Sequence, residues 1–214
     1  MVQDSLSSSE SPASEVLSPE TPPVYGRDAA DIHASQAGVH PRFEDLIDRA
    51  AALPTPMNAV VWPCEAHALL GAVESWRRGL MTPILVGDRA LIVRAADNAG
   101  IDVSECEVAP ASSGAEAARV AVGLARDGTV QGLIKGSLHT DEMMRAVVAP
   151  EHGLLLSRRV SHVFVLALPT YDDLLFVTDA AINIFPDLDA KRDIVQNAID
   201  LHHALALGVP RVAI

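Results

Sequence analysis

The stretch RRVSHVFVLALPTYDDLLFVTDAAINIFPDLDAKRDIVQNAIDLHHALAL, residues 158–207, decides the fold predicted for this chain. Two apolar runs, residues 160–168 and 174–177, predict strands, and a long helix is predicted to open near Asp189. Small polar residues lie between the second run and this helix. Because α/β proteins bind ligands beyond the carboxyl ends of their strands, these polar residues predict a ligand site.

Composition and charge argue against several classes of partner. The chain has 214 residues, a net charge of −12 and a pI of about 4.9, so nucleic acid and anionic membranes are not expected to bind. Aromatic residues make up only 4% of the chain, and the core must therefore consist mainly of Ala, Val, Leu and Ile. Such a core favours helices packed on parallel strands.

Cysteine usage and hydropathy indicate a cytoplasmic protein by elimination. Cys64 and Cys106 lie outside any metal-binding spacing, so free thiols in a reduced compartment and no metal site are expected. No apolar run approaches the roughly 20 residues that a transmembrane helix needs. No signal-peptide pattern is visible at the N-terminus.

The chain divides into a tail and one domain. Residues 1–40 are rich in Ser, Pro and acidic residues, and they predict a disordered tail because they hold too few apolar residues to offset the entropy of ordering. Residues 41–214 predict an α/β domain with a mainly parallel sheet flanked by helices in three layers, αβα. Besides the elements of 158–207, helices are predicted over 41–53, 65–80, 89–99, 114–128 and 140–148, and strands over 58–62, 82–86, 105–108, 132–134 and 209–214.

Lys135 and Gly136 follow the predicted strand 132–134 and precede a helix for which Thr140 is the predicted cap. A cation followed by a helix N-terminus is a physically sensible anion site, although the spacing is not that of a Walker A loop. A solvated loop lysine is the competing interpretation. His139 could donate to a phosphate or act as an acid or base, and a capping or surface histidine is an equally good interpretation.

Three residues at the start of the 158–207 stretch are further candidates. Arg159 and Ser161 have the same parity along an extended chain and can face one cleft, and His162 is a third candidate beside them. The competing interpretation is an exposed arginine pair followed by polar residues at a strand end.

The second group of candidates follows the predicted strand 174–177. Thr178, Asp179 and Asn183 can orient a ligand or simply hold a sharp turn, and both interpretations stay open. On the final helix, Lys191 and Asn197 could reach the same cleft, and solvated side chains on the helix surface are the competing interpretation.

Six motifs in order resemble the phosphate acetyltransferase and phosphate butyryltransferase family. They are RRVSHVFV (158–165), TDAAINIFPDLDAKRDIVQNAIDL (178–201), VVWPCEAHALLGAVESWRRGLMTPILVGD (60–88), GAEAARVAVGLARDG (114–128), LIKGSLHTDEMMRAVV (133–148) and LGVPRVAI (207–214). The resemblance covers roughly residues 55–214. It implies a two-lobed fold similar to the isocitrate and isopropylmalate dehydrogenases and a homodimer when the protein is complete.

The resemblance also implies a reaction, in which acyl-CoA and inorganic phosphate give acyl phosphate and CoA. CoA is then a substrate, and no tightly bound cofactor or metal is expected. The catalytic residues implied are Lys135, Arg159 and Ser161. The residues implied to bind substrate or CoA are Gly136, His139, Thr140, His162, Thr178, Asp179, Asn183 and Lys191.

One departure from the family concerns the C-terminus. The chain stops at Ile214, where family members continue to a late Ser-Arg-Ala-Asp type motif, so a C-terminally incomplete and weakly active or inactive chain is expected. Two other functions stay open: a non-catalytic CoA-binding or partner module, and a phosphate acyltransferase that depends on acyl-carrier protein.

Overall fold

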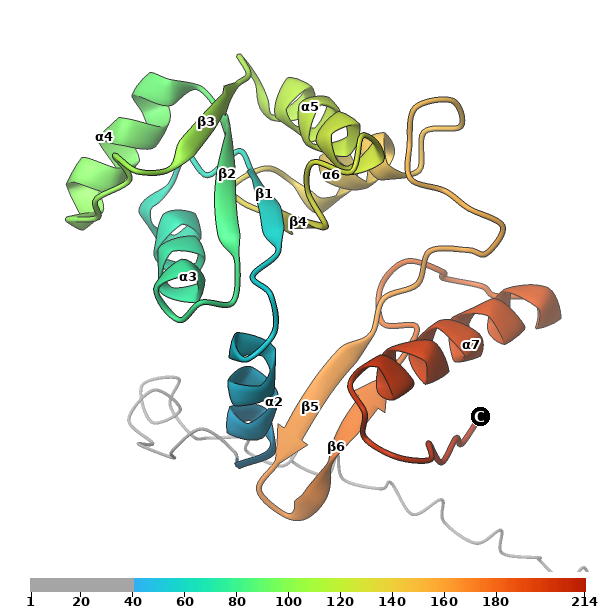
Figure 1. Ribbon diagram of the computed structural model, residues 1–214. Helices are drawn as coiled ribbons and strands as arrows, with labels where there is room; N and C mark the ends of the chain where they lie inside the picture. Colours follow the sequence, from blue (N-terminus) through green and yellow to red (C-terminus); the bar gives the residue numbers. More distant parts are fainter. Residues whose placement is uncertain (1–40) are drawn as a thin grey trace, which may run out of the picture. The chain divides into compact units, whose positions relative to one another are not determined.

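The computed structural model describes residues 41–214, and the predicted disordered tail lies outside the described residues (Figure 1). The helices are α2 (Pro41–Ala51), α3 (Ala66–Arg77), α4 (Arg89–Ala99), α5 (Gly114–Arg126), α6 (Thr140–Val147) and α7 (Leu188–Ala204). The strands are β1 (Met57–Val61), β2 (Thr82–Gly87), β3 (Glu107–Pro110), β4 (Gly132–Lys135), β5 (Phe164–Leu168) and β6 (Tyr171–Val177). None of these helices is long and apolar enough to cross a membrane.

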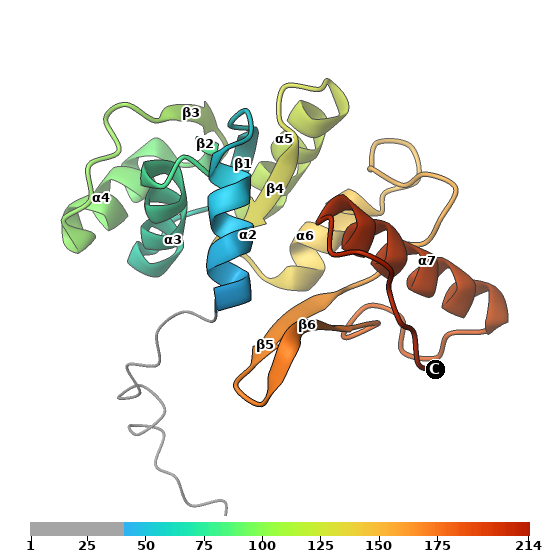
Figure 2. The ribbon, with the colours of Figure 1, turned by 60° about the horizontal axis from the view of Figure 1, so that its bottom comes forward.

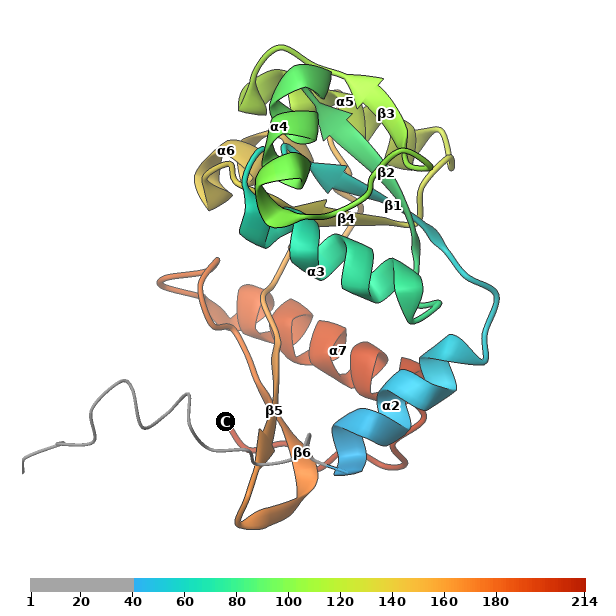
Figure 3. The same cartoon turned by 90° about the vertical axis from the view of Figure 1, so that its left-hand side faces the viewer.

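β1 to β4 form one parallel sheet in the order β3-β2-β1-β4. Successive strand residues point to opposite faces, and the core follows this alternation. Val60 and Leu85 pack with α3 and α4 on one face, whereas Val61 and Val86 pack with α5 on the other (Figure 3). The predicted three-layer arrangement around a parallel sheet is confirmed.

Local signals fix the helices that follow two of the strands. The Asp88 carboxylate caps α4 by accepting a hydrogen bond from Leu91 N–H at 3.0 Å, and Gly100 ends that helix at a φ of 65°. Ser113 caps α5 in the same way, through Glu116 N–H at 3.2 Å. Both helices therefore begin where their capping side chains predict.

The two apolar runs of the 158–207 stretch form an antiparallel hairpin in a sheet of their own (Figure 2). Leu168 pairs with Tyr171, so only two residues form the turn. The predicted strand 160–168 begins only at Phe164, because the main chain of Val160 and His162 binds side chains of residues 178–183 instead of a strand. The predicted parallel sheet therefore ends at β4.

Three other predictions of local structure need correction. Residues 209–214 form no strand, since no neighbouring strand pairs with them among the described residues. β3 lies two residues later than predicted. His139 occupies the N-cap position of α6, so Thr140 is the first helical residue and not the cap. The prediction that the last helix opens near Asp189 is confirmed, since α7 begins at Leu188 and is capped by Asp187, whose carboxylate accepts from Ala190 N–H at 2.8 Å.

Candidate active site

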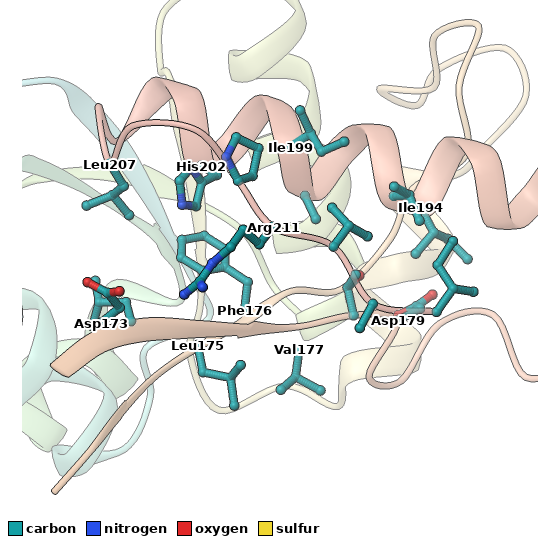
Figure 4. A pocket seen from close by; sticks show the side chains of 18 of the residues that line it. Asp173, Leu175, Phe176, Val177, Asp179, Ile194, Ile199, His202, Leu207 and Arg211 are labelled. Carbon is teal, nitrogen blue, oxygen red and sulfur yellow. The ribbon is translucent and has the colours of Figure 1, made fainter. Parts of the chain in front are cut away.

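Asp179, directly after β6, organises the polar segment between β6 and α7 (Figure 4). Its carboxylate accepts hydrogen bonds from the backbone N–H of His162 at 3.0 Å, of Ala181 at 3.2 Å and of Asn183 at 2.9 Å. The Asn183 side-chain amide donates to it as well. Partial burial raises the pKa of Asp179, but these hydrogen bonds outweigh burial and lower the pKa to about 2. Asp179 is therefore ionised near neutral pH and holds the segment around it.

Thr178 and Asn183 tie the same segment to the chain that leads into β5. Thr178 Oγ1 donates to the carbonyl oxygen of His162 at 3.0 Å. Asn183 Nδ2 donates to the carbonyl oxygen of Val160 at 3.0 Å, in addition to its bond to Asp179. The side-chain donors of both residues are thus used within the protein, which favours the turn-holding interpretation that the sequence left open.

Side chains of α7 hold the segment before β5 from the other side. Asn197 Nδ2 donates to the carbonyl oxygen of Arg159 at 2.8 Å and to Ser161 Oγ at 2.9 Å. Asp193 accepts from Arg159 N–H at 3.2 Å. Because these contacts involve the main chain of Arg159, its position is fixed while its exposed guanidinium has no ion pair or hydrogen bond among the described residues.

The neighbours of Arg159 differ from it in their pairing. Arg158 forms a 2.7 Å ion pair with Asp200, so its charge is neutralised on α7. The ring of His162 packs on that of Phe164, with 4.4 Å between the ring centroids. Arg159 is therefore the member of the arginine pair whose charge is left for a ligand.

Lys135 is the last residue of β4, and the predicted site residues Gly136, His139 and Thr140 follow it. Its Nζ donates to the carbonyl oxygens of Gly136 and Leu138, each at 3.1 Å. A lysine ammonium carries three protons, and these two contacts leave one for a ligand. Its side chain thus shapes the loop before α6 and still offers a charged donor.

Gly136 lies where no other residue fits. Its N–H donates to the carbonyl oxygen of Val61 at 2.9 Å, and an added Cβ would lie 2.5 Å from that oxygen and 2.7 Å from the carbonyl oxygen of Trp62. The glycine lets the loop cross directly against the end of β1. The next residue, Ser137, has a buried Oγ without a hydrogen-bond partner in the described residues.

His139 and Thr140 stand at the start of α6. The His139 side chain makes no capping hydrogen bond, and both residues are exposed. Asp141 and Glu142 occupy the first turn of the same helix. These carboxylates favour helix formation there but weaken the attraction of the helix N-terminus for an anion.

A cavity of about 920 Å³ is lined by α2, β6, α7 and residues of the C-terminal segment 206–214 (Figure 4). Figure 4 shows Phe176 directed toward α7, where its ring lies 5.2 Å from that of His202, and shows Leu175 and Val177 directed away. The predicted site residues that line the cavity are Thr178, Asp179, Asn183 and Lys191. The cavity therefore combines apolar and charged walls.

Within residues 41–214, neither a reactive thiol nor a group of metal ligands is found. Burial raises the pKa of Cys64 and of Cys106, so both are protonated near neutral pH and are poor nucleophiles. No group of three His, Cys, Asp or Glu residues in this part of the chain is placed to hold a metal ion.

The predicted site residues fall into two clusters. His162 binds Thr178 and Asp179, and Arg159 and Ser161 are joined to α7 through Asn197. Asn183 binds the neighbouring Val160 carbonyl oxygen, and Lys191 lines the same cavity as Thr178, Asp179 and Asn183. Lys135, Gly136, His139 and Thr140 form the other cluster. No hydrogen bond or ion pair between described residues joins the two.

The prediction from the sequence gave α7 a smaller part in holding the first cluster than the structure does. Asp193, Asn197 and Asp200 are spaced four and three residues apart, so they lie on one face of the helix. That spacing was readable from the sequence, but its partners in the segment 158–161 were not.

Comparison with known proteins gives a consistent result. Residues 112–214 match the family model described as "Phosphate acetyl/butaryl transferase". The chain is 50% identical over 173 residues to a phosphate acetyltransferase of Rhizobium meliloti, covering 81% of this chain and 55% of that protein. It is 33% identical over 171 residues to a phosphate butyryltransferase of Clostridium beijerinckii, covering 80% and 57%.

Solved structures support the fold. A phosphotransacetylase from Streptococcus pyogenes superposes with a TM-score of 0.65 at 15% sequence identity, over 79% of this chain and 60% of that one. The similarity of the fold to the isocitrate and isopropylmalate dehydrogenases stays a prediction. The chain spans about half the length of the curated relatives that it matches. By these sequence matches, the chain belongs to the phosphate acetyl/butyryl transferase family.

Proposed function

We propose that this chain transfers an acetyl or butyryl group between CoA and inorganic phosphate. The observation that carries the proposal is the 50% identity over 173 residues to a protein named phosphate acetyltransferase. The relatives that share 42% and 43% identity carry the same name, whereas those named butyryltransferase share 33% and 37%. Acetyl-CoA is therefore the first substrate to test.

The chemistry asks little of the protein beyond placing charges. An oxygen of phosphate attacks the thioester carbonyl, the C–S bond breaks, and CoA leaves as the thiolate. In reverse, the CoA thiolate attacks acyl phosphate and phosphate leaves. A tetrahedral oxyanion forms in both directions and needs donors or cations directed at it. No acyl group is bound to the enzyme in this scheme, which agrees with the raised pKa values of Cys64 and Cys106.

Lys135 and Arg159 are the cations that we assign to phosphate and to the oxyanion. Lys135 keeps one ammonium proton after its two contacts with loop carbonyls, and Arg159 has a fixed main chain and an unpaired guanidinium among residues 41–214. Ser161 is the hydroxyl that we assign to the same ligand. Gly136, His139, Thr140 and His162 border these groups along the chain and are proposed as substrate contacts.

The 920 Å³ cavity is proposed as the place for part of CoA. Its volume lies within the range of small-molecule sites, and its mixed walls suit a ligand with both apolar and charged parts. Lys191 would then pair with a phosphate of CoA, while Thr178, Asp179 and Asn183 would shape the wall. A homodimer and a cytoplasmic location remain part of the proposal.

The test is release of free CoA thiol from acetyl-CoA and from butyryl-CoA by the purified chain, with and without phosphate. We expect phosphate-dependent release that falls by about a hundredfold in Lys135→Ala and in Arg159→Ala, because each substitution removes a charged donor. Arg126→Ala is the matched control, since Arg126 is an exposed arginine in the last turn of α5 without an ion pair among the described residues.

Two results would contradict the proposal. One is thiol release by the folded chain that does not depend on phosphate, whereas no release at all agrees with the weak or absent activity expected of this chain. The other is a loss of activity in Arg126→Ala as large as that in Arg159→Ala.

A further inference from the structure

The side-chain amide of Asn197 has a fixed orientation. One of its terminal atoms lies 2.8 Å from the carbonyl oxygen of Arg159 and 2.9 Å from Ser161 Oγ. A carbonyl oxygen can only accept a hydrogen bond, so the atom that faces it must be the amide nitrogen. The same nitrogen then donates its second proton to Ser161.

That donation determines what the Ser161 hydroxyl can do. Its oxygen accepts from Asn197, and its single proton must therefore point elsewhere. No acceptor among the described residues takes this proton. The hydroxyl of Thr178 differs, since it donates its only proton to the carbonyl oxygen of His162 and has no proton left for a ligand. Ser161 is half-buried, so this proton can reach solvent or a ligand that takes the place of solvent.

A cation lies two residues before this hydroxyl in the chain. The same Asn197 nitrogen bonds the carbonyl oxygen of Arg159 and the hydroxyl of Ser161, so both residues are held against one point of α7. Two carboxylates of α7 lie nearby, but their repulsion of an anion is reduced because each has a partner. Asp193 accepts from Arg159 N–H and lies 3.6 Å from Arg192, and Asp200 is paired with Arg158. A guanidinium and a hydroxyl donor that are two residues apart match the acceptor oxygens of a phosphate group.

We propose that Asn197 is a positioning residue that turns the Ser161 hydroxyl proton toward a phosphate oxygen, with Arg159 binding the same phosphate. This inference rests on the proposed function for the identity of the ligand. Asn197 itself does not touch the ligand, and it acts by occupying the acceptor side of the Ser161 oxygen.

Asn197→Asp reverses the arrangement at Ser161, and it also sets a carboxylate oxygen against the Arg159 carbonyl oxygen, a cost that thermal unfolding records. A carboxylate can only accept, so the Ser161 proton turns toward residue 197 and away from the ligand. Ser161→Ala removes the hydroxyl, and the double variant tests whether the two residues act through each other. Gln196→Glu is the control, because it makes the same amide-to-carboxylate change one residue away on α7, where the amide contacts Asp200 and not Ser161.

The measurement is the dissociation constant of inorganic phosphate for the purified chain, from ³¹P NMR titration, with thermal unfolding as the check on folding. We expect Asn197→Asp and Ser161→Ala each to weaken phosphate binding by about tenfold, and Gln196→Glu by about twofold or less. In the Ser161→Ala background, Asn197→Asp should cost no more than the control. A purely structural role for Asn197 would produce additive losses instead.

Three outcomes would overturn the inference: additive losses in the double variant, equal losses in Gln196→Glu and Asn197→Asp, or no phosphate binding by the folded chain. Thiol release measured in parallel separates this result from the proposed function. Phosphate-dependent release that Asn197→Asp leaves intact refutes only the role of Asn197. Coupled phosphate binding supports the anion site, and thiol release that does not depend on phosphate refutes the acyl transfer to phosphate.

Discussion

The sheet region, residues 57–148, and the hairpin region, residues 158–214, differ in how far their apolar side chains are buried. All the buried apolar side chains of the described residues lie in the sheet region except Ala190 and Ile194. Most of the large exposed apolar side chains lie in the hairpin region, where Phe185 is 96% exposed. The sheet region therefore has a core of its own, whereas the hairpin region has little.

Polar contacts take the place of a core in the hairpin region. Asp179 and Asn183 bind the main chain before β5 from one side, and Asn197 binds it from the other. Burial of apolar area is additive over many atoms, but a network of this kind depends on a few groups. The comparison teaches that the site residues of the hairpin region are held mainly by hydrogen bonds, whereas the sheet region, which carries Lys135 and Gly136, is held by packing.

The largest expected effect would test the core of the sheet region. Leu85→Ala removes a fully buried side chain from the middle of β2 and should lower the free energy of unfolding by about 3 kcal/mol. Leu188→Ala, at a residue that is 83% exposed, should change it by less than about 0.5 kcal/mol. Urea denaturation measures both. Equal losses would end the distinction between the two regions.

A smaller effect is expected at the joint between β1 and β4. Gly136→Ala places a methyl group 2.5 Å from the Val61 carbonyl oxygen, and the main chain must shift at a cost of about 2 kcal/mol. Gly71→Ala is the control in α3, where an added Cβ meets nothing within 4 Å, and it should stabilise the chain by about 0.5 kcal/mol or more. The contrasting signs are read from thermal unfolding. Stabilisation by Gly136→Ala would show that the loop can move away freely.

The next prediction concerns the hairpin region and its dependence on pH. The pKa of Asp179 is lowered from 3.8 to about 2, so its carboxylate stabilises the fold above its unfolded pKa. This contribution is lost as the pH falls from 3.8 toward 2. Asp179→Asn should cost about 1.5 kcal/mol near neutral pH and remove that part of the acid transition. Asp172→Asn is the control, because its exposed carboxylate makes no hydrogen bond among the described residues.

Unfolding curves at several pH values between acid and neutral measure this effect. The prediction fails where Asp179→Asn and the parent chain lose stability over the same acid range by the same amount.

The smallest effect is expected for the ion pair of Arg158 and Asp200. Their side chains are 44% and 46% exposed, so solvent screens the 2.7 Å contact. Arg158→Ala should cost about 0.5 kcal/mol, and added salt should reduce this difference further. A loss above that of Asp179→Asn would mean that charge pairing, and not the Asp179 network, holds the hairpin region.

The sheet region was predictable because its elements are local. Each of its strands is a short apolar run between helices, and capping residues such as Asp88 and Ser113 announce the helices that follow. The hairpin region was less predictable because pairing there depends on distant partners. Residues 209–214 have the composition of a strand, but a strand needs a neighbour that the local pattern cannot reveal.

The candidate site divides in the same way. Lys135 and Gly136 were readable as a cation and a glycine after a strand, and the structure adds that the glycine is required by the Val61 carbonyl oxygen. The contact of Asn197 with Ser161 joins residues 36 positions apart. No local pattern encodes it, since it depends on how α7 packs across the segment before β5.

The spacing of Asp193, Asn197 and Asp200 along α7 sets which residues of the neighbouring segment these side chains can reach. One residue inserted between Asp193 and Asp200 would rotate everything after it by about 100° and separate its polar groups from their partners in one step. An insertion in the exposed hairpin turn between Leu168 and Tyr171 would leave that alignment in place. In this part of the molecule, length is under tighter constraint inside the helix than in the turn, whatever residues fill the positions.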